Sequence, residues 1–300
     1  MEYRNIFLAN PARLSVQREQ LVIEQAEKFT VPLEDISAVL IESRQVLLSA
    51  HAAAALAGHG VTVLFCDDKH LPCAQLLPVN QYCRQHKLLM AQCDMGKPLK
   101  KQLWQQIVAR KLQNQAACLR LSGREGWEEL RQMAGRVLSG DSDNREAVAA
   151  ALYFPRLFGP GFSRGDEADP RNAALNYGYA ILRACIARNL VVHGLEPCMG
   201  LHHRSELNNF NLADDLIEPY RPIVDLYVAQ HFTEMDEVLT PGQKAGLFNL
   251  TNYLVCQAGR QYRVMLSIGR ACAALADCIT EQTPSPELPE LIPLELHRYE

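Results

Sequence analysis

Short apolar runs, separated by polar or turn residues, fill the first 75 residues of the chain. Runs rich in Val, Ile and Leu cover residues 5–8, 13–17, 20–25, 36–41 and 61–66. Runs of this length and composition predict strands, and Arg18-Glu19 between the second and third predicts a hairpin turn. The Ala-rich residues 49–56 predict one short helix, which Gly58-His59-Gly60 ends. The pattern therefore predicts a small, β-sandwich-like N-terminal β domain, residues 1–75, with one short helix.

Apolar spacing becomes helical beyond residues 68–80, which are predicted to form a linker. Helices are predicted at 97–121, 125–138, 144–153, 170–195, from 211 onwards and at 242–256. Asp143 is the expected cap of the third, and Thr240-Pro241 of the last. Residues 159–169 form a loop in this scheme, and four prolines mark residues 283–300 as a tail. The predicted fold class is α+β, in which residues 76–282 form a larger all-α C-terminal domain.

Lysine and arginine are concentrated in the middle of the chain. The whole chain is 48% hydrophobic with a net charge of -4, which is ordinary for a globular protein. Residues 84–171, however, hold 15 Lys and Arg against 10 Asp and Glu. Two interpretations of these charges are open: they contact nucleic-acid phosphates, or they lie on solvated helix faces. The charges include Lys97, Lys100, Lys101 and the pair Arg110-Lys111. Composition alone favours the second interpretation.

Cysteine usage and the N-terminus bear on the cellular compartment. The ten cysteines include no C-x-x-C pair, which argues against a zinc ribbon and a disulfide framework and favours reduced thiols. The first nine residues lack the apolar core of a signal peptide. Residues 45–66 carry no Asp, Glu, Lys or Arg, but His51 and Gly58-His59-Gly60 interrupt them, so a helix, a turn and a strand explain them better than a membrane span. A cytoplasmic protein is expected.

The richest candidate site lies between residues 200 and 222. Gly200-Leu-His202-His203 precedes a polar loop, and Asp214, Asp215 and Glu218 follow at helical spacing that places carboxylates on one face. Pro219 and Pro222 predict a kink or break beside them. Like charges crowd in this way when a cation lies between them, although solvated acids at an ordinary helix start remain the alternative. Glu146, in the first turn of a predicted helix, is a second candidate, but the helix dipole alone explains a Glu there.

Several of these segments together resemble the universal CRISPR-associated integrase. The matching residues, in the order of that family, are 32–42, 46–49 and 60–67, Arg145-Glu146-Ala with Tyr153-Phe154, 172–182, Gly200-Leu-His-His, and Asp215-Leu-Ile-Glu-Pro-Tyr-Arg-Pro. The resemblance spans roughly residues 3 to 280, and the last two motifs are specific. It favours the type II branch of the family.

The resemblance implies a metal-binding triad of Glu146, His203 and Glu218. Adjacent His202 is the alternative histidine, and Asp215 is a ligand of second rank. Carboxylate and imidazole donors suit Mg²⁺ or Mn²⁺. The implied activity is that of a metal-dependent DNA endonuclease and integrase that joins the 3′-OH ends of short DNA fragments to a repeat array by transesterification.

The same resemblance implies the partners. They are double-stranded DNA, a second copy of the chain that pairs through the N-terminal domains, and a small ferredoxin-like protein of the adaptation complex, with which two homodimers form a heterohexamer. A metal-dependent nuclease of branched DNA in repair would need the same site. A DNA-holding scaffold with an inactive site is the alternative from another class, and the intact Glu146, His203 and Glu218 speak against it.

Overall fold

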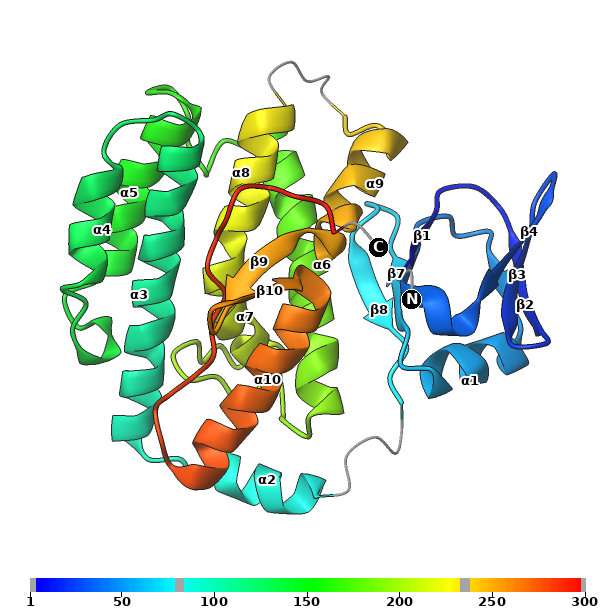
Figure 1. Ribbon diagram of the computed structural model, residues 1–300, viewed down its shortest axis with the longest axis horizontal. Coiled ribbons are helices and arrows are strands. Elements are labelled where there is room, and N and C mark those ends of the chain that lie inside the picture. Colours follow the sequence, from blue (N-terminus) through cyan, green and yellow to red (C-terminus); the bar gives the residue numbers. More distant parts are fainter. Residues whose placement is uncertain (1–3, 79–83, 233–237, 298–300) are drawn as a thin grey trace.

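The computed structural model describes residues 4–78, 84–232 and 238–297 and places a strand-rich N-terminal part beside a larger helical part (Figure 1). Two four-stranded sheets and one short helix, α1 (Ala50–Gly58), make up the N-terminal part. The predicted mixed α+β architecture is confirmed.

The first sheet joins the two parts of the molecule. Its order is β1 (Arg4–Leu8), β5 (Ile36–Ile41), β7 (Thr62–Cys66) and β8 (Pro72–Gln75). The first three strands are parallel, and β8 runs antiparallel along the edge. The prediction of a linker over residues 68–80 is wrong at β8, because a proline is tolerated as the first residue of an edge strand. Residues 79 and 80 of that predicted linker lie outside the described residues.

The second sheet contains the predicted hairpin. Its order is β4 (Lys28–Pro32), β3 (Gln20–Glu24), β2 (Arg13–Gln17) and β6 (Leu47–Leu48). Arg18 and Glu19 both have positive φ, 49° and 58°, which is the geometry of a tight hairpin turn with right-handed strand twist. The sequence pattern did not predict strand β4, because the strand is largely exposed. Half of the Phe29 surface is open to solvent.

Alternation along the first sheet divides its side chains between two apolar clusters. Val39 and Val63 face the second sheet and share a cluster with Leu14 and Leu21. Leu40, one residue further along β5, belongs instead to the large cluster of the helical part. Successive side chains of a strand point to opposite faces of its sheet. When both faces are covered, every side chain is buried and the strand's sequence is a continuous apolar run. Both parts of the molecule are therefore built on the same sheet.

Polar contacts reinforce this junction. Lys244 Nζ pairs with Glu42 Oε1 at 2.5 Å, and both side chains are at least 90% buried. Asn5 Nδ2 donates to Thr251 Oγ1 at 2.6 Å. Removing one partner of a buried pair leaves a charge without compensation, so these contacts fix how the N-terminal sheet sits on the helices.

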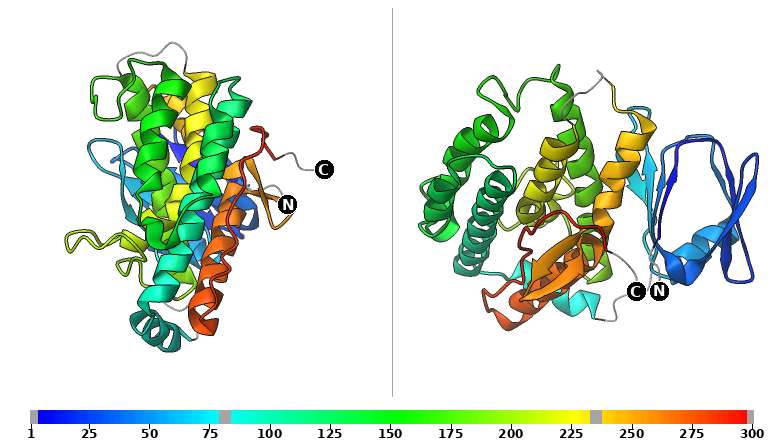
Figure 2. Two further views of the ribbon diagram at one scale, coloured as in Figure 1. Left: turned by 90° about the vertical axis from the view of Figure 1, so that its left-hand side faces the viewer. Right: turned by 45° about the horizontal axis from the view of Figure 1, so that its top comes forward.

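The helices of the larger part form layers whose outermost members, α4 and α5, lie farthest from the sheets (Figures 1 and 2). Their bounds are α2 (Gln85–Cys93), α3 (Lys97–Leu121), α4 (Trp127–Ala134), α5 (Arg145–Phe158), α6 (Pro170–Val192), α7 (Asn211–Ile217), α8 (Arg221–His231), α9 (Pro241–Asn249) and α10 (Val264–Glu281). Short 3-10 helices cover Leu33–Asp35, Ser139–Asp141, Glu218–Tyr220 and Leu250–Asn252. The long helices α3 and α6 supply much of the buried surface.

The prediction of an all-α second domain is wrong. Strands β9 (Leu254–Gln257) and β10 (Arg260–Arg263) pair antiparallel within it. The capping box of Thr240 and Gln243 starts α9 where the sequence indicated. The helix nevertheless ends at Asn249 rather than at residue 256, and Ala258 and Gly259, both with positive φ, turn the hairpin.

The C-terminal prolines lie in an extended segment that packs against the helical part. Leu288 and Leu291 are buried in the large cluster. Isolated bridges join Glu290 to Cys256 and Leu296 to Tyr253, so this segment extends the β9–β10 hairpin. Within the part of the chain that the structure describes, no helix is long and apolar enough to cross a membrane.

Candidate active site

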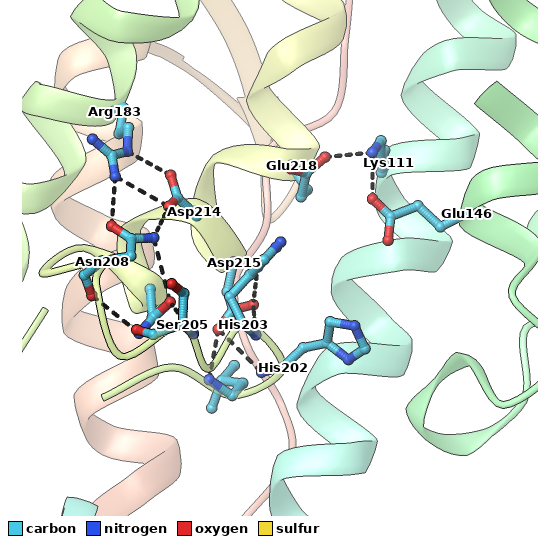
Figure 3. A network of polar contacts seen from close by, with 12 residues as sticks. Lys111, Glu146, Arg183, His202, His203, Ser205, Asn208, Asp214, Asp215 and Glu218 are labelled. Carbon is cyan, nitrogen blue, oxygen red and sulfur yellow. Dashed lines mark hydrogen bonds and ion pairs between the residues drawn. The ribbon is translucent and has the colours of Figure 1, made fainter. Parts of the chain in front are cut away.

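Glu146 occupies the first turn of α5. The helix begins there because the Asp141 carboxylate accepts the backbone N–H groups of Arg145 and Glu146 at 2.8 and 3.1 Å. The prediction that Asp143 caps this helix is wrong: its carboxylate pairs instead with the Arg145 side chain at 2.5 Å. The capped helix start directs Glu146 toward α3 (Figure 3).

Glu218 lies at the break between α7 and α8. Helix α7 ends at Ile217, and Glu218 opens the 3-10 helix Glu218–Tyr220. The predicted irregularity beside Pro219 and Pro222 is confirmed. The Glu218 side chain is 5% exposed, and its Oε1 accepts from Arg221 Nε at 2.8 Å.

Lys111 of α3 lies between these two carboxylates. Its Nζ is 2.6 Å from Glu146 Oε1 and also pairs with Glu218 Oε2. Figure 3 shows both glutamates pointing at this ammonium from different elements. Burial would lower the pKa of Lys111, but the two carboxylates outweigh burial and raise it above its ordinary value. Burial would likewise raise the pKa of Glu218, yet Lys111 and Arg221 hold it at about 2.

The sequence-based assignment of Lys111 to a DNA-binding or solvated helix face is therefore wrong. Its side chain is 10% exposed. The sequence does contain a signal for this position, because Lys111 follows Ile107 by four residues and precedes Leu112, and both are buried. A lysine on the apolar face of a helix requires a buried partner.

His203 ends the Gly200–His203 motif and is held by Asp215. The Asp215 carboxylate is fully buried and accepts the backbone N–H groups of Leu201, His202 and His203. Its Oδ1 also lies 2.8 Å from His203 Nδ1. This hydrogen bond raises the pKa of His203 above its ordinary value, against the effect of burial. With Nδ1 bonded to the carboxylate, Nε2 is the ring nitrogen left for another partner.

The motif's glycine has a steric reason. A Cβ at position 200 would lie 2.2 Å from the His203 carbonyl oxygen and 2.9 Å from Asp215 Oδ2. Both contacts are far shorter than atoms tolerate, so only glycine lets the loop close around the Asp215 carboxylate.

His202 has a different environment from His203. Its ring stacks on buried Trp104, with 4.4 Å between centroids and 7° between planes. Both histidine rings flank Trp104, but only the ring of His203 also contacts Asp215. The structure thus places His203, and not His202, in the carboxylate-oriented arrangement typical of a metal-ligating histidine.

The arrangement fits a divalent cation in its chemistry but not as a preassembled cage. Among the described residues, no three His, Cys, Asp or Glu side chains stand close enough together to hold a metal ion. Glu146 and Glu218 nevertheless converge on one positive charge, the Lys111 ammonium. Two carboxylates and a nearby imidazole form a donor set suited to Mg²⁺ or Mn²⁺. These residues would hold such an ion once it replaced the ammonium.

Asn114, one turn after Lys111, ties the site to the end of the chain. It is 2% exposed, and its Nδ2 donates to the carbonyl oxygens of Pro219 and Pro289 at 2.7 and 3.0 Å. Its Oδ1 accepts the Leu291 N–H at 3.0 Å. The 3-10 helix that carries Glu218 is thereby anchored to α3 and to the C-terminal segment.

Two cavities flank the candidate residues. One of 410 Å³ lies beside His203 and is lined in part by Lys100 and Arg204. Another of 180 Å³ lies beside Lys111 and Glu218; its other lining residues are Gln115, Phe154, Arg164, Tyr179, Arg221 and Asp225. The first places two cations and one carboxylate, Glu206, around His203, and the positive balance of this lining suits an anionic substrate.

Asp225, in the wall of the smaller cavity, accepts hydrogen bonds from the hydroxyls of Tyr153 (2.9 Å) and Tyr179. Burial raises the pKa of Asp225 to about 6, against the opposing effect of these hydrogen bonds and of two arginines. Burial also raises the pKa of both tyrosines. Both tyrosines are therefore packed in the core.

Comparison of the sequence with known protein families identifies the family of this chain. Residues 6–236 match the model of the CRISPR associated protein Cas1 family. The chain belongs to that family. It is 45% identical over 305 residues to a CRISPR-associated endonuclease Cas1 of Neisseria meningitidis serogroup C (strain 8013), with 100% of both chains covered. It is 31% identical to a CRISPR-associated endonuclease Cas1 of Pyrobaculum aerophilum, over 72% of this chain and 77% of the relative.

The fold agrees with solved structures. A CAS1 protein from Thermotoga maritima superimposes with a TM-score of 0.69 at 15% identity, covering 92% of this chain and 97% of that one. A casposase bound to integration product superimposes with a TM-score of 0.75 at 19% identity, covering 95% and 92%. At such identities these likenesses establish the fold alone.

Proposed function

We propose that the protein is a metal-dependent DNA endonuclease and integrase of CRISPR adaptation, of the type II branch. It joins the 3′-OH ends of short DNA fragments to a repeat array by transesterification. The observation that carries the proposal is the convergence of Glu146 and Glu218 on one buried cation beside carboxylate-oriented His203. Full-length similarity to a CRISPR-associated endonuclease of Neisseria meningitidis supports both the activity and the branch.

The chain's own residues would divide the work as follows. Glu146 and Glu218 would hold the divalent ion, and Asp215 keeps His203 turned so that its Nε2 would be available as a third donor. When bound, the ion stabilises the charge that develops on the attacked phosphate. Lys100 and Arg204, beside His203, position the DNA backbone by its negative charge.

The reaction exchanges one phosphodiester for another. The 3′-oxygen of the fragment forms a bond to a phosphorus atom of the repeat, and the bond from that phosphorus to the repeat's own 3′-oxygen breaks. The departing oxygen takes the proton that the attacking hydroxyl loses. Since the bonds broken and formed are alike, no protein nucleophile and no energy source is required.

We further propose that the protein acts in the cytoplasm as a homodimer, through residues 1–75, on double-stranded DNA. Two dimers would bind a small ferredoxin-like partner in a heterohexamer. The structural neighbours that support these partners are a Cas6-RT-Cas1–Cas2 complex, with a TM-score of 0.68, and a Cas1–DNA complex, with a TM-score of 0.53.

A gel assay with a labelled fragment, a repeat-bearing plasmid and Mn²⁺ tests the function. The wild-type protein should transfer label to the plasmid, and EDTA should prevent the transfer. Glu146→Gln, Glu218→Gln and His203→Ala should each abolish joining while the protein still binds DNA, because affinity for DNA comes mainly from Lys and Arg contacts spread over a surface. Glu125→Gln, at an exposed position ahead of α4, is the matched control.

The same assay separates the competing functions. Cleavage of branched DNA without any joining would identify a repair nuclease. DNA binding with neither product, in the presence of Mg²⁺ or Mn²⁺, would identify a scaffold. Undiminished joining by a folded Glu146→Gln protein would remove that residue from the site.

A further inference from the structure

Lys111 is placed where a bound metal ion would be expected. Its Nζ contacts Glu146 Oε1 at 2.6 Å and pairs with Glu218 Oε2, so one oxygen of each carboxylate that would ligate the ion is already engaged by the ammonium. The ammonium also compensates two carboxylates in a largely buried setting, where unpaired charges are costly.

A divalent ion and the ammonium cannot share these oxygens. A dication held by Glu146 and Glu218 would lie within a few ångströms of Nζ, and like charges repel strongly at that range in a poorly solvated site. Arg221 remains on Glu218 Oε1 and already neutralises part of its charge. The positive charge of Lys111 must therefore move away when the ion arrives.

The molecule has room for that movement. The 180 Å³ cavity beside Glu218 is lined by Lys111 itself, and Asp225 forms part of its wall together with Arg164 and Arg221. A lysine carries its compact charge on a flexible four-carbon stem, so rotation about side-chain bonds can carry Nζ into this cavity without moving α3.

We propose that Lys111 is a resident counter-cation that keeps Glu146 and Glu218 together in the metal-free protein and competes with the divalent ion for them. This inference rests on the proposed function, since it takes both glutamates as metal ligands. Two consequences follow. The metal-free site stays folded without its ion, and its affinity for the ion is lower than the ligands alone would give.

Metal binding and metal-free stability test the proposal without any DNA. The variants are Lys111→Met, which keeps the length of the stem but removes its charge, Lys111→Arg, which keeps the charge, and Lys101→Met, an exposed control on the same helix. Mn²⁺ binding is measured on each full-length protein at one pH from the electron paramagnetic resonance of free Mn²⁺. Thermal unfolding is measured in EDTA and in saturating Mn²⁺.

Competition predicts opposite changes in the two measurements. Lys111→Met should bind Mn²⁺ with a Kd about tenfold lower, equivalent to about 1.4 kcal/mol. Its Tm in EDTA should fall below that of the wild type, and saturating Mn²⁺ should close the gap. Lys111→Arg should resemble the wild type in its Tm in EDTA, and Lys101→Met in both measurements. Weaker or unchanged Mn²⁺ binding by Lys111→Met would overturn the proposal.

The outcomes distinguish this inference from the proposed function. A wild-type protein that binds no Mn²⁺ would contradict both. A wild-type protein that binds Mn²⁺ as tightly as Lys111→Met does would contradict only the competition. If Lys111→Met fails to fold in EDTA, Lys111→Gln is measured in the same way, because its amide can still donate to one carboxylate. Unchanged Mn²⁺ affinity in that variant would also overturn the proposal.

Discussion

His203 Nδ1 and Asp215 Oδ1 lie 2.8 Å apart, and the same carboxylate accepts three consecutive backbone N–H groups of the loop that carries the histidine. One buried side chain therefore sets both the path of the loop and the orientation of the ring. The family resemblance implied that Asp215 is a metal ligand of second rank, but both oxygens of its carboxylate are occupied by these contacts. Its role in the structure is to position His203.

Replacing Asp215 by Asn should damage the site through His203. The amide offers one acceptor where the carboxylate serves four donors, and its NH₂ group would face N–H groups. Loss of a carboxylate that orients a ligating histidine costs 10- to 100-fold in metal affinity or activity, roughly. Mn²⁺ titration should show that loss, with stability lowered by about 1–3 kcal/mol in urea.

Neighbouring Asp214, which pairs with Arg183, provides the matched control. Asp214→Asn should leave Mn²⁺ affinity unchanged. The NMR titration of the metal-free protein adds a second measurement, because the raised pKa of His203 should fall when Asp215 is neutralised. An unshifted imidazole would show that Asp215 holds only the loop.

The two adjacent histidines should differ sharply on substitution. His202→Ala removes a ring stacked on Trp104, and aromatic stacking contributes about 0.5–1.5 kcal/mol, so stability should fall modestly while joining continues. His203→Ala should abolish joining. The joining assay and urea unfolding measure both effects, and greater loss of joining from His202→Ala would reverse the assignment.

Asp225 should make the protein less stable as pH rises from about 4 to 6. Its folded pKa of about 6 lies above the ordinary 3.8. The folded state therefore keeps a proton that the unfolded chain has released, and this stabilisation is complete below the unfolded pKa and lost through the folded one. At 1.36 kcal/mol per pKa unit, the free energy of unfolding lost over this pH range amounts to about 3 kcal/mol.

Urea unfolding of wild type and Asp225→Asn across pH 4–7 measures that contribution. The difference between the two proteins isolates Asp225 from Glu218 and His203, whose shifted pKa values impose their own pH dependence. Parallel pH profiles would mean that Asp225 titrates alike in the folded and unfolded chains.

The lysines at the start of α3 should contribute to DNA affinity without regard to sequence. Replacing Lys97, Lys100 and Lys101 together by Gln should weaken binding and flatten its dependence on salt, because fewer counterions are released. Fluorescence anisotropy over a range of salt concentrations measures the slope. An unchanged slope would identify these lysines as solvated helix residues.

Tyrosine should not form a covalent link to DNA. The Tyr153 hydroxyl is buried and donates to Asp225, and its pKa is raised, so it is a poor nucleophile. Tyr153→Phe should retain joining while losing about 1–3 kcal/mol of stability, from the unsatisfied carboxylate. EDTA-sensitive release of a joined fragment, with religation of the target strand, is expected from both proteins. A covalent adduct after denaturation would contradict this mechanism.

Local sequence patterns predicted those features that depend on neighbouring residues. The β2–β3 hairpin, the Thr240 cap and the break at Pro219 are set by turn and capping chemistry within a few residues. Strands β8 and β9 were missed because their formation depends on partners elsewhere: β8 pairs along the edge of β7, and β9 with β10 and the C-terminal segment.

The candidate site shows the same contrast between features set by neighbouring residues and features that depend on distant ones. Motifs predicted Glu146, His203, Glu218 and Asp215, whereas the roles of Lys111 and Asp141, which contact or position Glu146, escaped the sequence analysis. Lys111 precedes Glu218 by more than a hundred residues, and its charge suggested a surface position until its burial between two carboxylates was seen. Asp141 rather than Asp143 caps α5 because the backbone around Gly140 takes positive φ, which spacing alone does not reveal.

Asn114 bonds at once to the carbonyl of Pro219, beside Glu218, and to residues 289 and 291. During synthesis from the N-terminus, these last residues leave the ribosome after every other segment of the site has been made. A nascent chain that stops short of them has all three proposed ligands but leaves one N–H and the side-chain oxygen of Asn114 unmatched inside the core. Anchoring of the 3-10 helix that carries Glu218 therefore waits for residues 289–291, so that a nascent chain that stops before them lacks a fully anchored site.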